Sequence, residues 1–260
     1  MTSPQNSFTK TLMLVFILKR LFTLFLTMLC LSFIVFSLVT IEPNLKKLAL
    51  NQANMRMEEE AVQTWLEKNG YKRPLLVQYS EWLGNALTGD FGYSTHFKKP
   101  VNDVVWPKLW HTGILMFWVL ILTIPISLLI GVVSGMREGS KTDRALSVFS
   151  IITTSVPQYV SGILFTIILS SWLKLFKGVA KAGNITFENF TLPVLTIVLY
   201  DIGYIARMTR ASMVEVMNAQ YIRTARLKGM SFISVVFKHA LRNALIAPFT
   251  VIMLQFPWLL

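Results

Sequence analysis

The chain has 260 residues, of which 53% are hydrophobic and 15% charged, with a formal net charge of +12 and a mean hydropathy of +0.54. So large an apolar fraction with so few charges excludes an ordinary soluble domain. Several uncharged stretches approach or exceed the ~20 residues needed to cross a hydrocarbon core. The composition therefore predicts an all-α, polytopic membrane protein.

The first uncharged run, Leu21–Ile41, follows the basic pair Lys19 and Arg20. A cleaved signal sequence has such a basic start, but this run is too long and no small-x-small cleavage site follows it. Cys30 is the single cysteine and lies inside the run, so no disulfide forms within the chain. We expect residues 1–41 to contain a cytoplasmic N-terminus and a retained first span.

Residues 42–108 are nearly neutral, with nine basic and eight acidic residues, and are expected to lie in the periplasm. The stretch Met55–Asn69 has helix-forming composition and Gly70 is a stop signal for it. A second short helix is predicted over Gln78–Leu87. The segment is therefore expected to be small and partly helical.

Residues 109–260 are predicted to form the main transmembrane domain. With the first span, about five spans are expected in the chain, the last of them incomplete. The four spans of this domain are predicted over about residues 112–136, 145–173, 189–206 and 243–260.

Residues 207–242 form a loop with seven basic residues and one acidic residue. Short loops rich in Lys and Arg stay in the cytoplasm. The loop is therefore expected on the same side as the N-terminus, in a pattern that suits a bacterial inner membrane.

Pro157 interrupts the span predicted over residues 145–173. Polar groups beside a helix break at membrane depth usually face a protein-lined or watery cavity. A kink that serves only packing is the alternative. The candidate residues of a translocation pathway at this break are Ser155, Pro157, Gln158, Tyr159 and Ser161.

Asp201 is the only acidic residue in the apolar run that precedes the basic loop. A carboxylate inside a membrane costs several kcal/mol unless it is paired or hydrated, so it marks a functional hypothesis. We add Asp201 to the candidate pathway residues. The alternative is that it reaches the water boundary or pairs with Arg207 or Arg210.

No catalytic motif is recognised. Because no Gly is followed by Lys, a P-loop is excluded, and the histidines lack the spacing of a zinc protease. Basic residues lie at span ends rather than in a stripe, which argues against nucleic-acid binding. The chain is expected not to be an enzyme and to use no metal or cofactor.

Residues 211–243 combine basic charge with two predicted helices. Ala211–Lys228 suits a helix, and Gly229 can adopt the left-handed conformation that ends it. Ser231 can cap a second helix. A groove in a soluble partner can hold such a bent protrusion. Binding of anionic lipid headgroups is the alternative, but it requires no defined hinge.

This segment resembles the cytoplasmic "EAA" loop of ABC importer permeases, and more narrowly that of the oligopeptide, dipeptide and nickel permeases. The matching stretches are Tyr221 to Gly229 and His239 to Ala244. Further motifs similar to the family are Lys19-Arg20-Leu21, Gly89 to Ser94, Ser155-Val156-Pro157 and Ala206 to Arg210. The resemblance covers nearly the whole chain.

The resemblance implies a bundle of the type I ABC importer permease kind and a set of partners. These are a homologous second permease, two cytoplasmic ABC ATPase subunits that hydrolyse ATP, and a periplasmic or extracellular solute-binding protein, all working in a lipid bilayer. The ATPase-docking residues that it implies are Arg223, Thr224, Ala225, Lys228, Gly229, Met230, Ser231, His239 and Asn243. The chain would then form half of a pathway for peptides or a related small solute, with nickel as the alternative cargo.

Permeases of this family continue through the rest of a fifth span and a sixth, whereas the sequence stops at Leu260. We therefore expect a fragment, a truncated product or a degenerate copy, and a non-transporting membrane anchor is the alternative function. An ion channel is disfavoured because neither a ring of acids nor a carbonyl filter is predicted.

Overall fold

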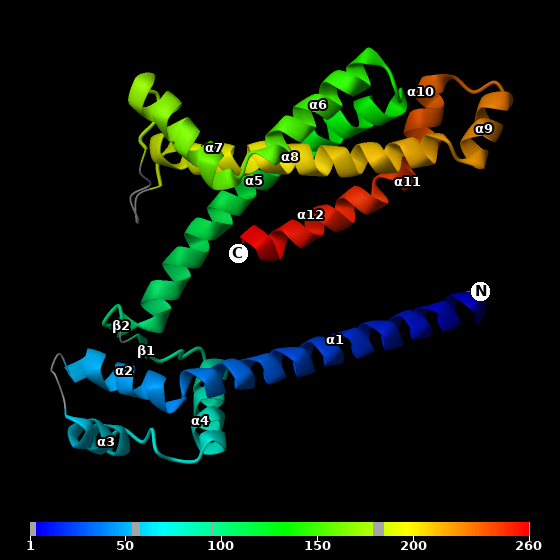
Figure 1. Ribbon diagram of the computed structural model, residues 1–260. Helices are drawn as coiled ribbons and strands as arrows, with labels where there is room; N and C mark the ends of the chain where they lie inside the picture. The colour runs from blue at the N-terminus through cyan, green and yellow to red at the C-terminus, as the bar shows by residue number, and fades with distance from the viewer. Residues whose placement is uncertain (1–3, 54–57, 95, 179–184, 260) are drawn as a thin grey trace. The chain divides into compact units, whose positions relative to one another are not determined.

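The computed structural model describes residues 4–53, 58–94, 96–178 and 185–259, and it divides into two compact units, Met1–Val105 and Trp106–Leu260. Within the described residues both units are built from helices (Figure 1), which confirms the all-α class. Three helices are long and apolar enough to cross a membrane. The number rises to five when each of two sharply bent helix pairs is taken as one span.

The first unit holds a long helix and three shorter ones. Its elements are α1 (Pro4–Val39), α2 (Glu42–Ala53), α3 (Glu59–Lys68), α4 (Leu75–Leu87) and the antiparallel two-residue strands β1 (Tyr93–Ser94) and β2 (Lys99–Pro100). The membrane-length part of α1 is Leu12–Val39, so the apolar helix begins before the predicted start at Leu21.

The segment after α1 is helical, as predicted, but holds one helix more than expected. Gly70 has a φ of +76° just beyond α3, which confirms the predicted stop. Residues 55–57, the first three of the helix predicted over 55–69, lie outside the described residues. Helix α2 was not predicted, because its polar sequence shows no clear apolar period. Tyr79 of α4 fixes that helix to α1 through a 2.7 Å hydrogen bond between its Oη and Ser32 Oγ.

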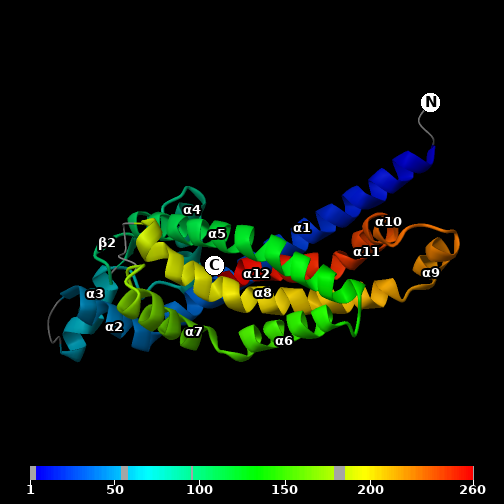
Figure 2. The same cartoon turned by 90° about the horizontal axis from the view of Figure 1, so that it is seen from above.

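The second unit carries the remaining helices. They are α5 (Val101–Met136), which begins in the first unit, α6 (Lys141–Ser155), α7 (Gln158–Phe165), the π-helical η1 (Thr166–Trp172), α8 (Phe187–Met217), α9 (Gln220–Leu227), α10 (Phe232–Val235), the π-helical η2 (Val236–Ala240), α11 (Leu241–Ala244) and α12 (Ile246–Leu259). Both α6 and α12 pack against α8 (Figure 2).

The span predicted over 145–173 is two helical segments that meet at 92°. The break lies at Val156, whose backbone is extended, and at Pro157, which caps α7. A residue before proline is forced out of the helical conformation, which explains the position of the break.

Helix α8 continues to Met217, well past the predicted span end at residue 206. Its buried face extends through Ile205, Thr209 and Met213, so packing maintains the helix beyond the apolar run. Part of the loop predicted over 207–242 is therefore helix that packs within the unit.

Glycines let α8 approach its neighbours closely. A Cβ on Gly131 of α5 would lie 2.3 Å from Thr209 Cβ, and one on Gly203 of α8 would lie 2.0 Å from Thr153 Oγ1. Neither position has room for a side chain unless a helix moves. These contacts fix α5 and α6 against α8 and so position the candidate sites on that helix.

Candidate functional site

The segment after α8 is a bent helical protrusion, here called the knob and defined as residues 218–244. Gly229 follows α9 with a φ of +81°, which confirms the predicted left-handed turn. Ser231 then caps α10, with its Oγ accepting a hydrogen bond from the Ser234 amide at 3.4 Å. The single helix predicted over 211–228 is wrong in one respect, because Asn218 and Ala219 separate α8 from α9.

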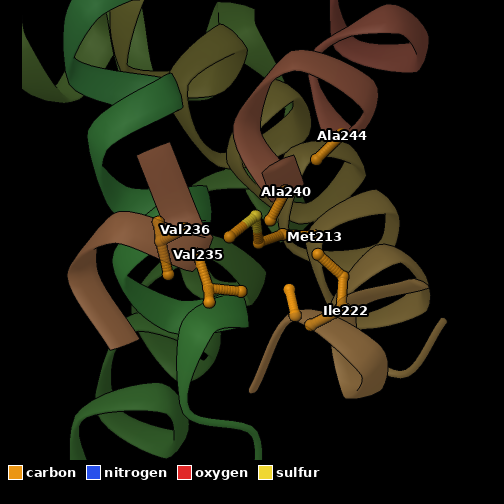
Figure 3. Close-up of a cluster of buried hydrophobic side chains, with 7 residues drawn as sticks. Met213, Ile222, Val235, Val236, Ala240 and Ala244 are labelled. Carbon is orange, nitrogen blue, oxygen red and sulfur yellow. The ribbon is translucent and has the colours of Figure 1, made fainter. Parts of the chain in front are cut away.

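The knob has an apolar core of its own, which joins it to α8. Met213 lies at its centre, and α9, α10, η2 and α11 each contribute side chains that point toward it (Figure 3). The seven buried residues of this cluster are Met213, Ile222, Ala225, Val235, Val236, Ala240 and Ala244. The knob is therefore a packed structure continuous with α8, not a flexible loop.

The candidate docking residues occupy different environments in the knob. Arg223, Thr224, Lys228, Gly229, Ser231 and Asn243 are exposed, Met230 and His239 are half-buried, and Ala225 is buried. The Asn243 amide donates a hydrogen bond to Tyr221 Oη at 3.0 Å, which ties α11 to α9. Because Ala225 belongs to the core, it supports the knob from inside and offers no surface to another protein.

The knob also exposes large apolar side chains that were not among the candidates. Leu227 at the end of α9 is 83% exposed, and Ile233 and Phe237 are exposed on the second helical segment. Positions 233 and 237 are four apart and so fall on one helix face. That spacing was the signal in the sequence that could have identified them.

A cavity of about 500 Å³ lies beside the break between α6 and α7. The residues that line it are Pro157, Gln158, Tyr159, Tyr200, Asp201, Tyr204, Gln255 and Trp258. The structure thus brings together four of the six candidate pathway residues. Ser155 is outside the lining and donates to the Ile151 carbonyl at 2.7 Å, and Ser161 is buried elsewhere on α7.

Four of the lining residues were not foreseen from the sequence. Tyr200 and Tyr204 flank Asp201 on α8, and Gln255 and Trp258 come from α12. Gln255 was detectable in principle, because it is a polar residue in an otherwise apolar run. Its meeting with α8 depends on how α12 packs, which the sequence does not show.

Asp201 is 1% exposed and accepts a hydrogen bond from Gln255 Nε2 at 3.2 Å. The alternative pairing with Arg207 or Arg210 is wrong. Arg207 Nη1 contacts Thr154 Oγ1 at 3.5 Å, and Arg210 binds a different carboxylate. Within the part of the chain that the structure describes, no salt bridge reaches Asp201.

That other carboxylate is Asp143, at the start of α6. Arg210 donates to both of its oxygens, from Nε at 2.5 Å and from Nη2 at 2.8 Å. Ser134 Oγ and the Gly139 amide add further hydrogen bonds, at 2.5 and 2.8 Å. This network joins α5, α6 and α8 close to the knob. Its signal in the sequence was the spacing of Ser140, the helix cap, and Asp143 three residues later.

Two family models match the chain. Residues 127–260 match the model described as "Binding-protein-dependent transport system inner membrane component". Residues 13–112 match the model described as "Binding-prot-dependent transport system membrane comp, N-term". The two matches together include most of each unit.

Individual relatives agree with the family models. The chain is 37% identical over 201 residues to the "Oligopeptide transport system permease protein AppB" of Bacillus subtilis. The aligned stretch covers 74% of this chain and 64% of that protein. It is 33% identical over 251 residues to the "Probable peptide ABC transporter permease protein y4tP" of Sinorhizobium fredii, 95% of this chain and 80% of that protein. It is 32% identical over 255 residues to the "Glutathione transport system permease protein GsiC" of Escherichia coli K12, 95% of this chain and 79% of that protein.

Proposed function

This chain belongs to the family of binding-protein-dependent transport system inner membrane components, the permease subunits of ABC importers, and we propose that it forms half of the pathway through which such an importer carries peptides. The observation that carries the proposal is the knob, because its exposed charged and apolar residues stand on a core that is continuous with α8. Movement of a partner bound to the knob would therefore be passed to α8, a helix of membrane-spanning length.

The partner that suits the knob is a cytoplasmic ABC ATPase. A groove binds a short helix best when apolar anchors project from one face and charges surround them. Ile233 and Phe237 supply such anchors, and Arg223 and Lys228 supply positive charge beside Leu227. In a complete importer two ATPase subunits would engage this chain and a homologous second permease, and the ATPases would hydrolyse ATP.

The cargo is inferred from the relatives. Their names refer to oligopeptide, peptide and glutathione transport, so we favour a peptide over nickel. A solute-binding protein outside the cell would deliver the peptide. The cavity beside Asp201 would then lie on the pathway, at the bend between α6 and α7.

Orientation follows from charge. Lys19 and Arg20 precede most of the apolar part of α1, and the knob carries most of the basic residues of the 207–242 region. Both ends of this pattern suit the cytoplasmic face of an inner membrane. The segment from α2 to α4 would face outward, toward the solute-binding protein.

Replacing Gly229 with Val tests the docking role. A β-branched residue in the left-handed conformation costs about 1–2 kcal/mol, so the turn between α9 and α10 should change shape. We expect the variant to insert into the membrane at the wild-type level and to lose the ATPase subunits that co-purify with the wild-type chain. Quantitative mass spectrometry of the membranes measures the inserted chain, and the same method after affinity purification measures the co-purified ATPase.

Gly89→Val is the matched control. Gly89 also has a positive φ, +90°, and a Cβ there would meet nothing within 4 Å, but it lies in the first unit after α4. Its backbone strain is comparable, and ATPase recovery should stay at the wild-type level. Equal recovery from the Gly229 variant, or no ATPase with the wild-type chain, would contradict the docking role.

A further inference from the structure

We propose that the cavity beside Asp201 is a binding subsite for the protonated amino group of the passing solute. The inference rests on the proposed function, because it assumes that the cavity lies on the transport pathway. It goes further by naming the ligand chemistry, a primary ammonium such as the N-terminus of a peptide.

The first support is the carboxylate. Asp201 lies near the middle of α8, is buried, and accepts one identified hydrogen bond, from Gln255 Nε2 at 3.2 Å. A carboxylate has about four lone-pair sites for hydrogen bonds, and an ammonium group has three donors and no acceptor. A buried carboxylate without a cation carries a large desolvation penalty, which a cationic ligand would reduce.

The second support is the set of aromatic rings around Asp201. Tyr159, Tyr200, Tyr204 and Trp258 all line the same cavity. A cation over the face of an aromatic ring is attracted by the ring quadrupole, most strongly for Trp and Tyr. A neutral apolar solute would gain nothing from the carboxylate, and an anion would be repelled by it.

The third support is an unsatisfied donor in the same cavity. Gln158 Nε2 is buried and has no hydrogen-bond partner among the described residues. An orphaned buried amide is costly, so it points to a ligand atom that accepts a hydrogen bond. In a peptide, the first carbonyl oxygen belongs to the same residue as the terminal ammonium, with only the Cα and the carbonyl carbon between them. A cavity that contains both a carboxylate and an amide donor therefore suits the terminal ammonium and the first carbonyl oxygen of a peptide.

The cations of the chain that were candidates to fill this role are engaged elsewhere. Arg210 is bound to Asp143 at 2.5 and 2.8 Å, and Arg207 contacts Thr154. In the described residues, then, Asp201 takes part in no identified ion pair. The position is available to a cation that comes from outside the chain.

The test compares two probes in the reconstituted importer, trialanine and N-acetyl-trialanine, which differ in the terminal positive charge. Initial uptake into proteoliposomes is measured for the wild type, Asp201→Asn and Asp201→Glu. The same external binding protein delivers both probes to every variant, so a change in the uptake ratio belongs to the permease. We expect Asp201→Asn to lower the trialanine preference about tenfold, as for loss of one charged hydrogen bond, and Asp201→Glu to retain most of it.

A second measurement avoids the binding protein altogether. Trp258 lines the cavity. Adding trialanine to the full chain in lipid nanodiscs should therefore change the tryptophan fluorescence, and the change should saturate as the trialanine concentration rises. N-acetyl-trialanine should not, and Trp258→Phe should remove the signal. Gln158→Met removes a donor that has no partner among the described residues, so it should leave folding intact and weaken trialanine binding severalfold.

The outcomes separate the two proposals. A wild-type importer that transports neither probe would overturn the proposed function. A wild type that transports trialanine, with the same probe ratio in Asp201→Asn and no saturable fluorescence change, would overturn the ammonium subsite alone.

Discussion

Asp143 and Arg210 show how a single ion pair can organise the end of this bundle that lies next to the knob. The Asp143 side chain is 3% exposed, and it accepts hydrogen bonds from α5, from the turn before α6, and from α8. Two parallel bonds from one guanidinium give the pair a fixed geometry that a lysine cannot reproduce. The three helices are therefore held in register just before the knob begins.

Removing the Asp143 charge tests this role. We expect Asp143→Asn to lower the free energy of unfolding by about 2 kcal/mol, because it leaves Arg210 without its partner in a partly buried position. Arg210→Lys should cost less, since it keeps the charge but loses the second hydrogen bond. Thermal unfolding of the purified chain in detergent measures the difference.

An exposed pair in the first unit serves as the control. Arg73 Nη1 and Glu81 Oε1 are 2.8 Å apart, and both side chains are about half exposed. Glu81→Gln should change the stability by less than about 1 kcal/mol, because solvent screens such pairs. If Asp143→Asn is no more damaging than Glu81→Gln, the network does not organise the bundle.

For single residues, the sequence showed that the charged side chains in α8 matter, but not which side chains they contact. Asp201 and Arg210 are nine residues apart, which places them on about opposite sides of one helix at 3.6 residues per turn. The pairing with Arg210 was therefore impossible once α8 continued past residue 206, and Arg207, the other candidate, contacts Thr154. The length of α8 therefore determines which side chains Asp201 and Arg210 can reach, and that length depends on tertiary packing.

Helices α6 and α8 approach each other closely at Gly203. Gly203 faces Thr153 and the Ser150 carbonyl, and an added Cβ would lie 2.0 and 2.7 Å from their oxygens. One of these atoms belongs to the backbone, so a rotamer change alone cannot relieve the clash. Small residues at such positions let membrane helices pack closely.

Gly203→Ala should therefore separate α6 from α8. We expect a loss of about 1–3 kcal/mol, the usual cost of overpacking, seen as reduced recovery of monodisperse protein after mild heating. Gly113→Ala in α5 is the control, because its Cβ would meet nothing within 4 Å. The control should match or exceed the wild type, since alanine favours a helix over glycine. Equal recovery of the two variants would argue against a tight α6–α8 contact.

The helices also show which features the sequence could predict. The break at Pro157 and the turn at Gly229 follow from backbone sterics of one residue, and both are present. The 92° bend and the separation of α8 from α9 depend on what each helix packs against. No local pattern encodes those contacts, so the break at Pro157 was expected but neither its 92° angle nor the separation of α8 from α9 was foreseen.

For the whole molecule, composition alone identified a multi-pass helical membrane protein. The described helices provide between three and five spans, according to whether bent pairs count as single spans. Hydropathy detects spans because the bilayer demands long apolar helices whatever their partners. It cannot show which side each loop faces, and only the distribution of positive charge bears on that.

The orientation is tested by labelling single cysteines. In a Cys30→Ser background, we expect Asn69→Cys to react with a membrane-impermeant maleimide in intact cells. Asn6→Cys should react only after the membrane is opened, because the basic start of the chain favours the cytoplasm. Reaction of both positions from the same side would contradict the proposed topology.

Met213 and Asp201 belong to the same uninterrupted stretch of α8, twelve residues apart, or ~18 Å along the axis. A straight helix has no joint at which rotation can be absorbed, so turning its inner end turns its middle as well. Displacing the bend that follows Met213 and reshaping the cavity around the Asp201 carboxylate are then one motion. An inhibitor bound at either end of that stretch should therefore block the movement of the bend and the change in the cavity together.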